Sequence, residues 1–366
     1  MPVYLDHNAS TRIDPRVLEV MLPYLSGPYG NASSLHRYGR AARDAVETAR
    51  AQLARLVNAQ PQEIVWTSGG TESDNLALKG SAAARVLYGA TEHPAVMEAA
   101  ESLRKTGCEV ESIAVDAEGL IRWDLFKKQL VPGALVSIMR ANNETGVIQD
   151  IAHAAALAHA HGARVHVDAV QAAGKIAVDF PALGCDLMSL SSHKIYGPKG
   201  IGALVVKGGV ELHPLHHGGP QERGLRGGTE NVAAIAGFGA AAELAAQELD
   251  ARAAHALALR ERLEASLKQN ARITIFGAGA PRLLNTVQFA VAGYDGEALL
   301  MQLDRKGMAV SSGSACASGN HEPSHVLMAM GYSREVALGA IRVSLGKDNT
   351  AAEVDQFLAA LGALAP

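Results

Sequence analysis

Cysteine is scarce in this chain, which has only three among its 366 residues: Cys108, Cys185 and Cys316. The three are odd in number and far apart, and no two of them form a Cys-x-x-Cys pair. A framework of disulfide bonds is therefore not expected. The pattern instead predicts free thiols and a reducing compartment.

Long apolar runs and a strong charge of one sign are also missing. The first ten residues, MPVYLDHNAS, carry charged and polar side chains where a secretory signal needs an apolar run. No apolar run elsewhere is long enough to span a bilayer. The net charge of -4 provides no basic field to attract nucleic acid or an acidic membrane face. We therefore expect a cytoplasmic protein that acts on small molecules, with neither nucleic acid nor a membrane as its partner.

What the chain does contain is the composition of an ordinary globular protein, with 48% hydrophobic and 19% charged residues. Its length predicts a large core divided between two domains of unequal size. In the first of these, short β-rich runs alternate with alanine-rich helical stretches, which predicts a mostly parallel α/β sheet. The predicted strands lie at 63–68, 134–139, 164–170, 186–192 and 202–207.

The remainder of the chain has a different pattern. Residues 231–270 are rich in Ala, Leu and Glu and contain no proline, which predicts a long helix linking the domains. Strand-like runs separated by helical stretches then predict a smaller α+β domain, and these runs lie at 273–279, 285–291, 307–313 and 341–346. We expect a large domain of residues 13–256 and a small domain of residues 1–12 and 257–366.

Three polar features follow predicted strands. Lys194 leaves one strand end into a Gly/Pro loop, and Asp168 ends another strand with Gln171 three residues later. A third strand ends in Ser-Gly-Gly-Thr, which brings Thr71 together with the free N–H groups of a helix start. Taken singly, these are a solvated lysine, a helix-capping aspartate and a capping box. Ligands of open α/β sheets, however, bind at the carboxyl ends of strands.

Together the three features are the parts that pyridoxal 5'-phosphate requires from a protein. Lys194 can form a Schiff base, and the helix start suits a phosphate, although no Walker pattern is present. Asp168 can keep the pyridine nitrogen protonated, which lets the cofactor accept electrons from the α-carbon of the substrate. Gln171 can donate to the phenolic oxygen. We therefore expect pyridoxal 5'-phosphate as the cofactor.

The motifs TSGGTESDNLA, NNETG, VDAVQAAGK, SSHKIYGPKG and SSGSAC occur in this order along the chain. In this combination the chain resembles the cysteine desulfurases of the NifS/IscS type, members of the class V aminotransferase family. The resemblance extends from residue 4 to residue 346. It implies an α/β protein of PLP-dependent transferase fold type I, with a mostly parallel sheet in a large domain and a smaller α+β domain.

The resemblance also implies a role for each cofactor-binding residue. Lys194 would form the Schiff base, Asp168 would pair with the pyridine nitrogen, and Gln171 would contact the phenolic oxygen. The residues that it assigns to the phosphate are Gly70, Thr71, Ser191 and His193, with Thr229 reaching the phosphate of the neighbouring subunit. The protein is therefore expected to be a homodimer in which each site is completed across the interface.

Three further residues match positions of the family near the substrate. His93 matches a histidine that stacks on the cofactor ring and takes part in proton transfer, and Asn143 matches an asparagine beside the cofactor and the substrate carboxylate. Arg342 matches the arginine that clamps this carboxylate. Without the family resemblance, the three would be a loop histidine, a turn-forming asparagine and a surface-strand arginine.

Cys316 lies between Gly313 and Gly319, in the stretch SSGSACASGN. The resemblance implies that its thiolate attacks the sulfur of the substrate L-cysteine, which leaves a persulfide on Cys316 and releases L-alanine. The glycines would let the thiolate visit the substrate and then a sulfur-acceptor protein outside. The acceptor would serve iron–sulfur cluster assembly or thiolation, and the sequence leaves open which. Cys108 and Cys185 are expected to be apolar fillers.

Three alternatives stay open at this point. Another fold type I enzyme, an aminotransferase or a selenocysteine lyase, would share the cofactor residues, and an aminotransferase would not need Cys316. A catalytically silent binding subunit would also keep most of the motifs. Cys316, His321 and His325 offer a partial zinc set, but Pro323 between the histidines disfavours it, and we expect no metal.

Overall fold

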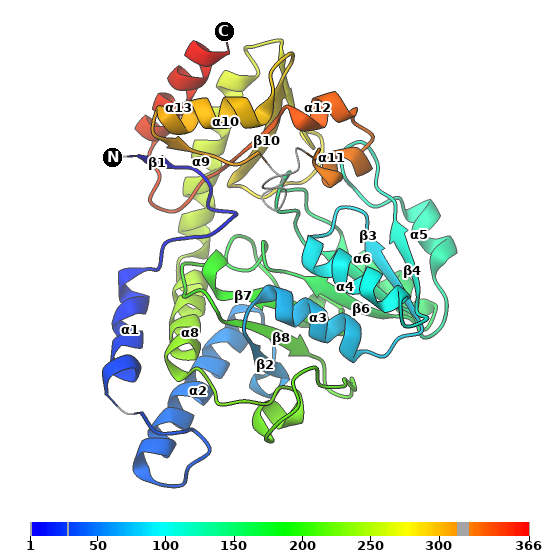
Figure 1. The fold of residues 1–366 in the computed structure, drawn as a ribbon, viewed down its shortest axis with the longest axis vertical. Coiled ribbons are helices and arrows are strands. Elements are labelled where there is room, and N and C mark those ends of the chain that lie inside the picture. Colours follow the sequence, from blue (N-terminus) through cyan, green and yellow to red (C-terminus); the bar gives the residue numbers. More distant parts are fainter. Residues whose placement is uncertain (1, 28, 313–321, 366) are drawn as a thin grey trace.

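The computed structural model describes residues 2–27, 29–312 and 322–365. A seven-stranded sheet forms the centre of the larger part of the molecule (Figure 1). In the order in which they pair, its strands are β2 (Ile64–Thr67), β8 (Gly202–Val206), β7 (Leu187–Ser191), β6 (Arg164–Asp168), β5 (Leu135–Met139), β3 (Arg85–Gly89) and β4 (Glu109–Ile113). Only β8 is antiparallel to its neighbours, β2 and β7. All five strands predicted for this region are present, and the predicted mostly parallel sheet is confirmed.

Helices cover both faces of this sheet, which is why its central strands read as continuous apolar runs. Alternate residues of a strand enter different cores: Ile64 and Trp66 pack in one, and Val65 packs in the other. The helices of the first core are α1 (Pro15–Ser26), α2 (Arg37–Leu56), α5 (Trp123–Gln129), α6 (Ile151–Ala160), α7 (Phe180–Leu183) and α8 (Val232–Gln247). The second core lies under α3 (Gly70–Gly80) and α4 (Pro94–Arg104).

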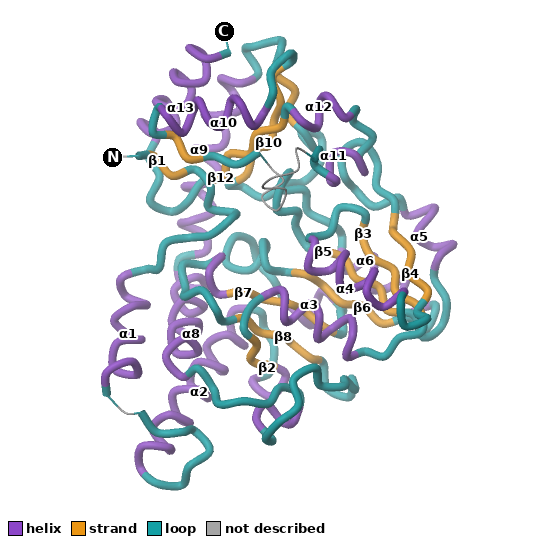
Figure 2. The backbone as a smooth tube through the Cα atoms, viewed as in Figure 1, coloured by secondary structure: helices purple, strands orange, loops and turns teal. Residues whose placement is uncertain are grey.

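The smaller part contains an antiparallel sheet of three strands, shown in orange in the upper part of Figure 2. Its order is β12 (Ala340–Ser344), β10 (Thr286–Val291) and β9 (Ile273–Ile275). The N-terminal strand β1 (Val3–Tyr4) pairs in parallel with β11 (Met308–Ala309) beside it. The helices of this part are α9 (Leu249–Leu267), α10 (Gly296–Arg305), α11 (His325–Ala329), α12 (Arg334–Leu338) and α13 (Ala351–Leu364).

The N-terminal segment connects the two parts of the molecule. Val3 and Leu5 belong to the core of the smaller part, whereas Val17, on α1 (Pro15–Ser26), packs in the core of the large sheet. Figure 1 shows the intervening blue segment passing from one part to the other. Separate cores of this kind are what the proposed division into residues 13–256 and residues 1–12 with 257–366 would produce.

The predicted long helix of residues 231–270 is wrong in one respect, because the structure forms two helices, α8 and α9, bent by 71° relative to each other. The two helices belong to different cores, so the chain must change direction between them. Glu248 lies at the bend and accepts hydrogen bonds from Arg16 (2.7 Å) and Arg252 (2.7 Å). Within the described residues no single helix meets the length and hydropathy requirements of a membrane span, although this bent pair meets them when taken together.

Candidate active site

A cavity of about 270 Å³ lies at the carboxyl ends of β5, β6 and β7, where the smaller part meets the large sheet. This is the position at which open parallel sheets bind ligands. The residues of the sequence prediction that line it are Gly70, Thr71, His93, Asn143, Asp168, Gln171, Ser191, His193, Lys194 and Arg342. Segments more than 270 residues apart in the chain thus contribute to one cavity.

One end of the cavity is formed by the start of α3. The helix begins directly after β2, and its N-cap, Gly69, makes no side-chain capping hydrogen bond. Because the N-cap is Gly69, Thr71 lies inside the helix, and the alternative of a capping box around Thr71 is wrong. The first N–H groups of the helix stay available to a ligand. Gly70 is required here, because a Cβ at this position would lie 2.9 Å from Cγ2 of Val170. Ser191, at the end of β7, and His193 also line the cavity.

Asp168 ends β6 and is 6% exposed. Its Oδ1 accepts the N–H of Val170 at 2.8 Å. Burial raises the pKa of Asp168 to about 6, against the opposing effects of the Val170 N–H and the charge of Lys194. A carboxylate in this environment can pair with a positively charged pyridinium. The positive charge would stabilise the ionised carboxylate, which burial otherwise disfavours.

Asp74 also lines the cavity, and the sequence prediction did not include it. It shares the inward face of α3 with Gly70 and Ser73, a spacing that could have identified it. Burial and the nearby charge of Asp168 raise the pKa of Asp74 well above its ordinary value. Because Asp168 has a backbone donor and Asp74 Oδ1 has no hydrogen-bond partner among the described residues, we assign the proton to Asp74 and the negative charge to Asp168.

Lys194 follows β7 in a single 3₁₀ turn, Ser192–Lys194. Its Nζ donates to the carbonyl oxygens of Asn8 at 2.6 Å and Ala9 at 2.9 Å. The Asn8 carbonyl also accepts from Nε2 of Gln171 at 2.8 Å. The side chain of Asn8 donates from Nδ2 to the Asn143 carbonyl at 3.0 Å. Asn8 therefore connects three residues of the site. The sequence prediction missed this role, because it depends on the path of the N-terminal segment between the two parts of the molecule.

His93 is the N-cap of α4, and its Nδ1 accepts the N–H of Ala95 at 3.1 Å. Burial, together with the positive charges of Lys194 and His325, lowers the pKa of His93 to about 4. The ring is therefore neutral at neutral pH. Because Nδ1 accepts a hydrogen bond, the single ring proton must reside on Nε2. His93 lines the cavity as a neutral aromatic ring with a defined tautomer, as stacking on a cofactor requires.

Arg342 lies on β12 and is 1% exposed. Its Nη2 donates to Asp6 Oδ1 at 2.6 Å and its Nη1 to the Asn143 carbonyl at 2.9 Å. The alternative of a surface arginine is therefore wrong. Its Nε is buried and has no partner in the described part of the chain, so a donor remains for a ligand carboxylate.

The asparagine that forms the turn of the NNETG motif is Asn142 and not Asn143. Its Oδ1 accepts the N–H groups of Glu144 and Thr145, each at 2.9 Å. Asn143 instead lines the cavity. The turn-forming role considered for Asn143 therefore falls to the preceding residue.

One described residue of the prediction is not brought into this cavity, and another lies outside the described residues. Thr229 is exposed and lines a separate cavity of about 170 Å³, together with Ser68 and Arg226. Cys316 lies outside the described residues, as does His321 of the zinc alternative. His325 is described, and its Nε2 lies 2.8 Å from the carbonyl oxygen of Glu92.

The other two cysteines have the environments expected of structural residues. Cys185 is 2% exposed and packs in the core of the large sheet. Cys108 is partly buried, and its Sγ donates to the carbonyl of Ala83 at 3.3 Å. Burial raises the pKa of both thiols above the ordinary value. Both therefore stay protonated at neutral pH, which makes them poor nucleophiles.

The chain matches the class-V aminotransferase family over residues 3–357. It belongs to that family. It is 48% identical over 367 residues to a cysteine desulfurase of Gluconacetobacter diazotrophicus. The alignment covers 97% of this chain and 91% of the relative. The solved structure of a NifS-like protein is similar with a TM-score of 0.93 and 39% identity, over 100% of this chain and 99% of the other. A structure of SspA in complex with cysteine is similar with a TM-score of 0.84 and 32% identity, over 95% of this chain and 100% of the other.

These comparisons confirm the predicted fold type I class and pyridoxal 5'-phosphate as the cofactor of this enzyme. The cavity fits the group in its chemistry. It offers a helix start for a phosphate, a buried carboxylate at Asp168, and an amine at Lys194. The neutral imidazole of His93 lines the same cavity as these groups.

Proposed function

We propose that this enzyme is a cysteine desulfurase that converts L-cysteine to L-alanine and transfers the sulfur to Cys316. The observation that carries the proposal is the single cavity that ten predicted residues line, including the proposed base Lys194 and the proposed carboxylate clamp Arg342. Neither the aminotransferase nor the silent-subunit alternative explains why a free thiol follows this site in the motif SSGSAC.

The residues around the cavity have different roles in the proposed reaction. Pyridoxal 5'-phosphate, when bound, supplies an electron sink for bond breaking at the substrate. Lys194 would anchor the cofactor, and its Nζ, when free, would accept the α-proton of the substrate. Asp168 would hold a positive charge on the pyridine nitrogen. His93, neutral with its proton on Nε2, would contact the cofactor and could exchange a proton with the substrate.

Arg342 selects an α-amino acid by its carboxylate. Its guanidinium is held in place by Asp6 and by the Asn143 carbonyl, so little conformational freedom is lost when a carboxylate binds. An arginine fixed in this way orients the substrate, because planar guanidinium and carboxylate groups pair in a defined geometry. The substrate side chain then extends to the remaining side of the cavity.

Cys316 supplies the nucleophile in this proposal. Its thiolate attacks the substrate sulfur; a sulfur–sulfur bond forms, the bond between carbon and sulfur breaks, and its electron pair stays with carbon. Protonation of that carbon gives L-alanine, and Cys316 retains the transferred sulfur as a persulfide. The reaction therefore needs no external oxidant or reductant. A sulfur-acceptor protein then takes the sulfur, for iron–sulfur cluster assembly or for thiolation.

The described residues on either side of residues 313–321 lie close to the cavity. Ser311 pairs with Arg342 through two backbone hydrogen bonds, of 2.7 and 3.2 Å. Ser324 donates to Glu144 Oε2 at 2.5 Å. Cys316 is five residues from Ser311 (316 − 311 = 5), which corresponds to a maximum reach of about 17 Å for an extended chain. This reach supports a thiol able to meet a substrate that Arg342 holds.

The proposed reaction is tested by its stoichiometry. The purified holoenzyme is incubated with L-cysteine, and L-alanine, sulfane sulfur and 2-oxo acids are measured together. We expect L-alanine and transferable sulfur in equal amounts. An aminotransferase would instead consume a 2-oxo acid acceptor and form no alanine from cysteine alone, and a selenocysteine lyase would show turnover with L-selenocysteine but almost none with L-cysteine.

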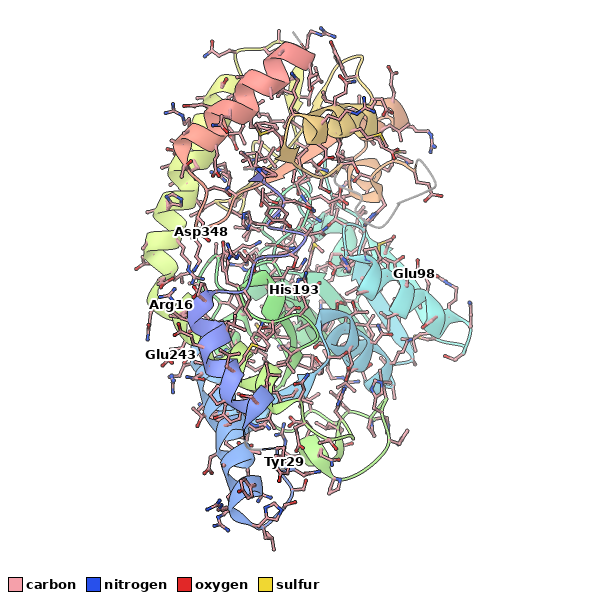
Figure 3. The ribbon with its side chains drawn as sticks, turned by 60° about the vertical axis from the view of Figure 1, so that its left-hand side comes forward. Arg16, Tyr29, Glu98, His193, Glu243 and Asp348 are labelled. Carbon is pink, nitrogen blue, oxygen red and sulfur yellow. The ribbon has the colours of Figure 1, made fainter. Side chains whose placement is uncertain are left out.

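The homodimer belongs to the same proposal. Large apolar side chains are exposed along α1 and the following segment, with Tyr29 91% and Leu35 82% exposed. Figure 3 shows Tyr29 at the lower end of the molecule, far from the small domain. The exposed set is Leu18, Val20, Leu22, Leu25, Tyr29, Leu35 and Tyr38. This number of exposed apolar side chains in one segment supports an interface with a second copy, which we propose also brings Thr229 to the partner's phosphate site.

The dimer is tested by placing charge in this segment. The double substitution Leu25→Asp with Tyr29→Asp should convert the dimer to a monomer in light scattering coupled to size-exclusion chromatography, because two carboxylates would have to be buried. The matched control is Met301→Asp on α10, which changes an exposed residue of the small domain (54% exposed) and should remain dimeric. A dimer that persists in the double variant contradicts this interface.

A further inference from the structure

Lys175 lies four residues after Gln171, in the turn that follows β6. The turn is closed by hydrogen bonds from the N–H groups of Lys175 and Ile176 to the carbonyl of Ala172. Gly174 has a φ of +72°, and a Cβ there would lie 2.7 Å from Cγ2 of Ile195. The turn therefore requires glycine at 174, and it brings the side chains of residues 171 and 175 together.

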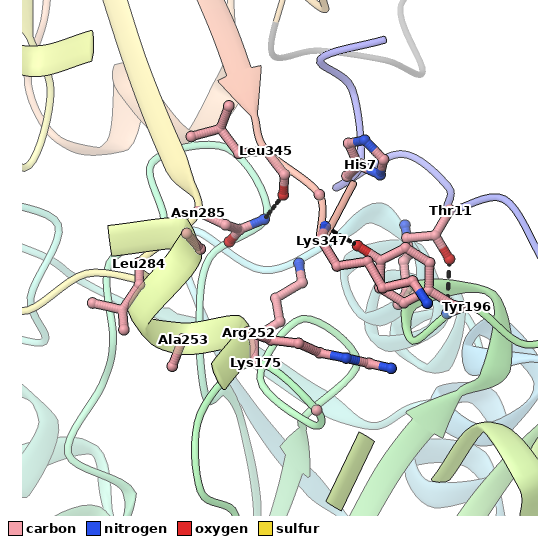
Figure 4. Close-up of a pocket in the computed structure, with 14 residues that line it drawn as sticks. His7, Thr11, Lys175, Tyr196, Arg252, Ala253, Leu284, Asn285, Leu345 and Lys347 are labelled. Carbon is pink, nitrogen blue, oxygen red and sulfur yellow. Dashed lines mark hydrogen bonds between the residues drawn. The ribbon is translucent and has the colours of Figure 1, made fainter. Parts of the chain in front are cut away.

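Lys175 makes two hydrogen bonds that involve the site. Its Nζ donates to Gln171 Oε1 at 2.6 Å and to Asn8 Oδ1 at 2.8 Å. Gln171 in turn donates from Nε2 to the Asn8 carbonyl at 2.8 Å. Asn8 and Gln171 line the cofactor cavity, whereas Lys175 lines a smaller cavity of about 40 Å³, shown in Figure 4; Lys194 lines both cavities. Lys175 thus acts on the cofactor cavity only through its neighbours.

These contacts determine which end of the Gln171 amide faces which partner. The side-chain nitrogen of Lys175 carries N–H donors in either protonation state, so it can donate to the Gln171 oxygen. The Asn8 carbonyl can only accept, so its partner must be the amide nitrogen. With one N–H held by Asn8, the second N–H of the same nitrogen is left for the cofactor cavity. A flipped amide would place oxygen against oxygen at Asn8.

The surroundings of Lys175 are cationic. The charged or titratable residues that line its cavity are His7, Lys194, Tyr196, Arg252 and Lys347, and no carboxylate belongs to this set within the described chain. Removal from water and the positive charges of Lys194 and Arg342 lower the pKa of Lys175 well below its ordinary value. An amine kept here without a carboxylate partner is costly to the fold. Its two hydrogen bonds to Asn8 and Gln171 offer a functional reason for its presence.

We propose that Lys175 is a positioning residue that fixes the Gln171 amide so that its N–H faces the phenolic oxygen of pyridoxal 5'-phosphate. This inference rests on the proposed role of Gln171 at that oxygen. Such an N–H stabilises negative charge on the oxygen and so favours the deprotonated form of the chromophore. Lys175 thereby lowers the pH at which the visible band of the holoenzyme titrates.

The test is a pH titration of the visible absorption band in the holoenzyme without any substrate. Lys175→Met, which has a side chain of similar length and no donor, should raise the pKa of the band by roughly one unit, the size expected for a hydrogen bond to a charged group. Gln171→Leu should raise it by a similar amount. Lys175→Arg, which keeps a donor, should restore a value near that of the wild type.

The double variant separates positioning from a direct effect of charge. If Lys175 acts through the amide, Lys175→Met causes no further shift in a Gln171→Leu background. Additive shifts, or an unchanged pKa in the single Lys175→Met variant, would overturn the inference. If the methionine variant does not fold, Lys175→Arg still decides, because a shifted band in a variant that keeps the donor contradicts the proposal. No arm uses L-cysteine, so a failure here is distinct from a failure of the desulfurase function.

Discussion

Replacing Cys316 by alanine should lower L-alanine production from L-cysteine by about a thousandfold or more, because the nucleophile that removes sulfur is gone. The visible band of the cofactor should survive, since Lys194, Asp168 and Gln171 line a cavity that the described residues form. The measurement is the rate of alanine formation, with the absorption spectrum recorded on the same sample.

The other two thiols cannot replace Cys316. Cys185 is enclosed in the core of the large sheet, and Cys108, just before β4, donates to the carbonyl of Ala83. The matched control is therefore Cys108→Ser, which removes a partly exposed thiol and should keep alanine formation close to the wild-type rate. Alanine formation by Cys316→Ala at a rate near that of the wild type would exclude Cys316 as the sulfur nucleophile.

Replacing Asp168 by asparagine should lower kcat/KM for L-cysteine by roughly a hundredfold or more, the size seen when a fixed electrostatic partner of a reacting group is removed. An amide cannot stabilise a positive charge on the pyridine nitrogen, so the electron sink is weakened. The matched control is Asp74→Asn. Because burial and the charge of Asp168 keep Asp74 protonated, an amide of the same shape resembles its native state, and the loss should stay within a few fold.

The same variant gives a prediction about pH. Burial raises the pKa of Asp168 to about 6, so its charge is present above that pH and is lost below it. The affinity of the protein without cofactor for pyridoxal 5'-phosphate should therefore fall as the pH decreases through about 6, and the fall should be absent in Asp168→Asn. The measurement is the dissociation constant of the cofactor as a function of pH. An equal loss of activity in Asp74→Asn and Asp168→Asn would contradict the assignment of the charge.

Much of the site could be predicted from the sequence, because parallel strands bring their carboxyl ends to one edge of the sheet. Asp168, Ser191 and Lys194 each follow such a strand, and the structure places them around one cavity. Asn8 could not be predicted in this way. Its contacts with Gln171 and Lys194 depend on an N-terminal segment that crosses between domains, and no local pattern encodes a contact over 163 or 186 residues.

The fold shows the same division between local and long-range information. The central strands were predictable because both of their faces are buried and their sequences are continuously apolar. Two strands of this sheet were missed. The edge strand β4 is exposed at three of its five positions and carries two glutamates. The strand β3 is buried at four of its five positions, but it begins with Arg85 and ends with Gly89, which shortens its apolar run to three residues. The break between α8 and α9 was missed because Glu248 favours helix locally, whereas its pairing with Arg16 is a tertiary contact.

The most direct test of the proposed function is the position of the transferred sulfur. The holoenzyme is incubated with L-cysteine, alkylated without reduction and digested, and the cysteine-containing peptides are weighed by mass spectrometry. The account predicts that the mass of one additional sulfur atom appears on the peptide containing Cys316, while the peptides of Cys108 and Cys185 stay unmodified. Sulfur on either of those two residues, or on none of the three while L-alanine accumulates, would contradict it.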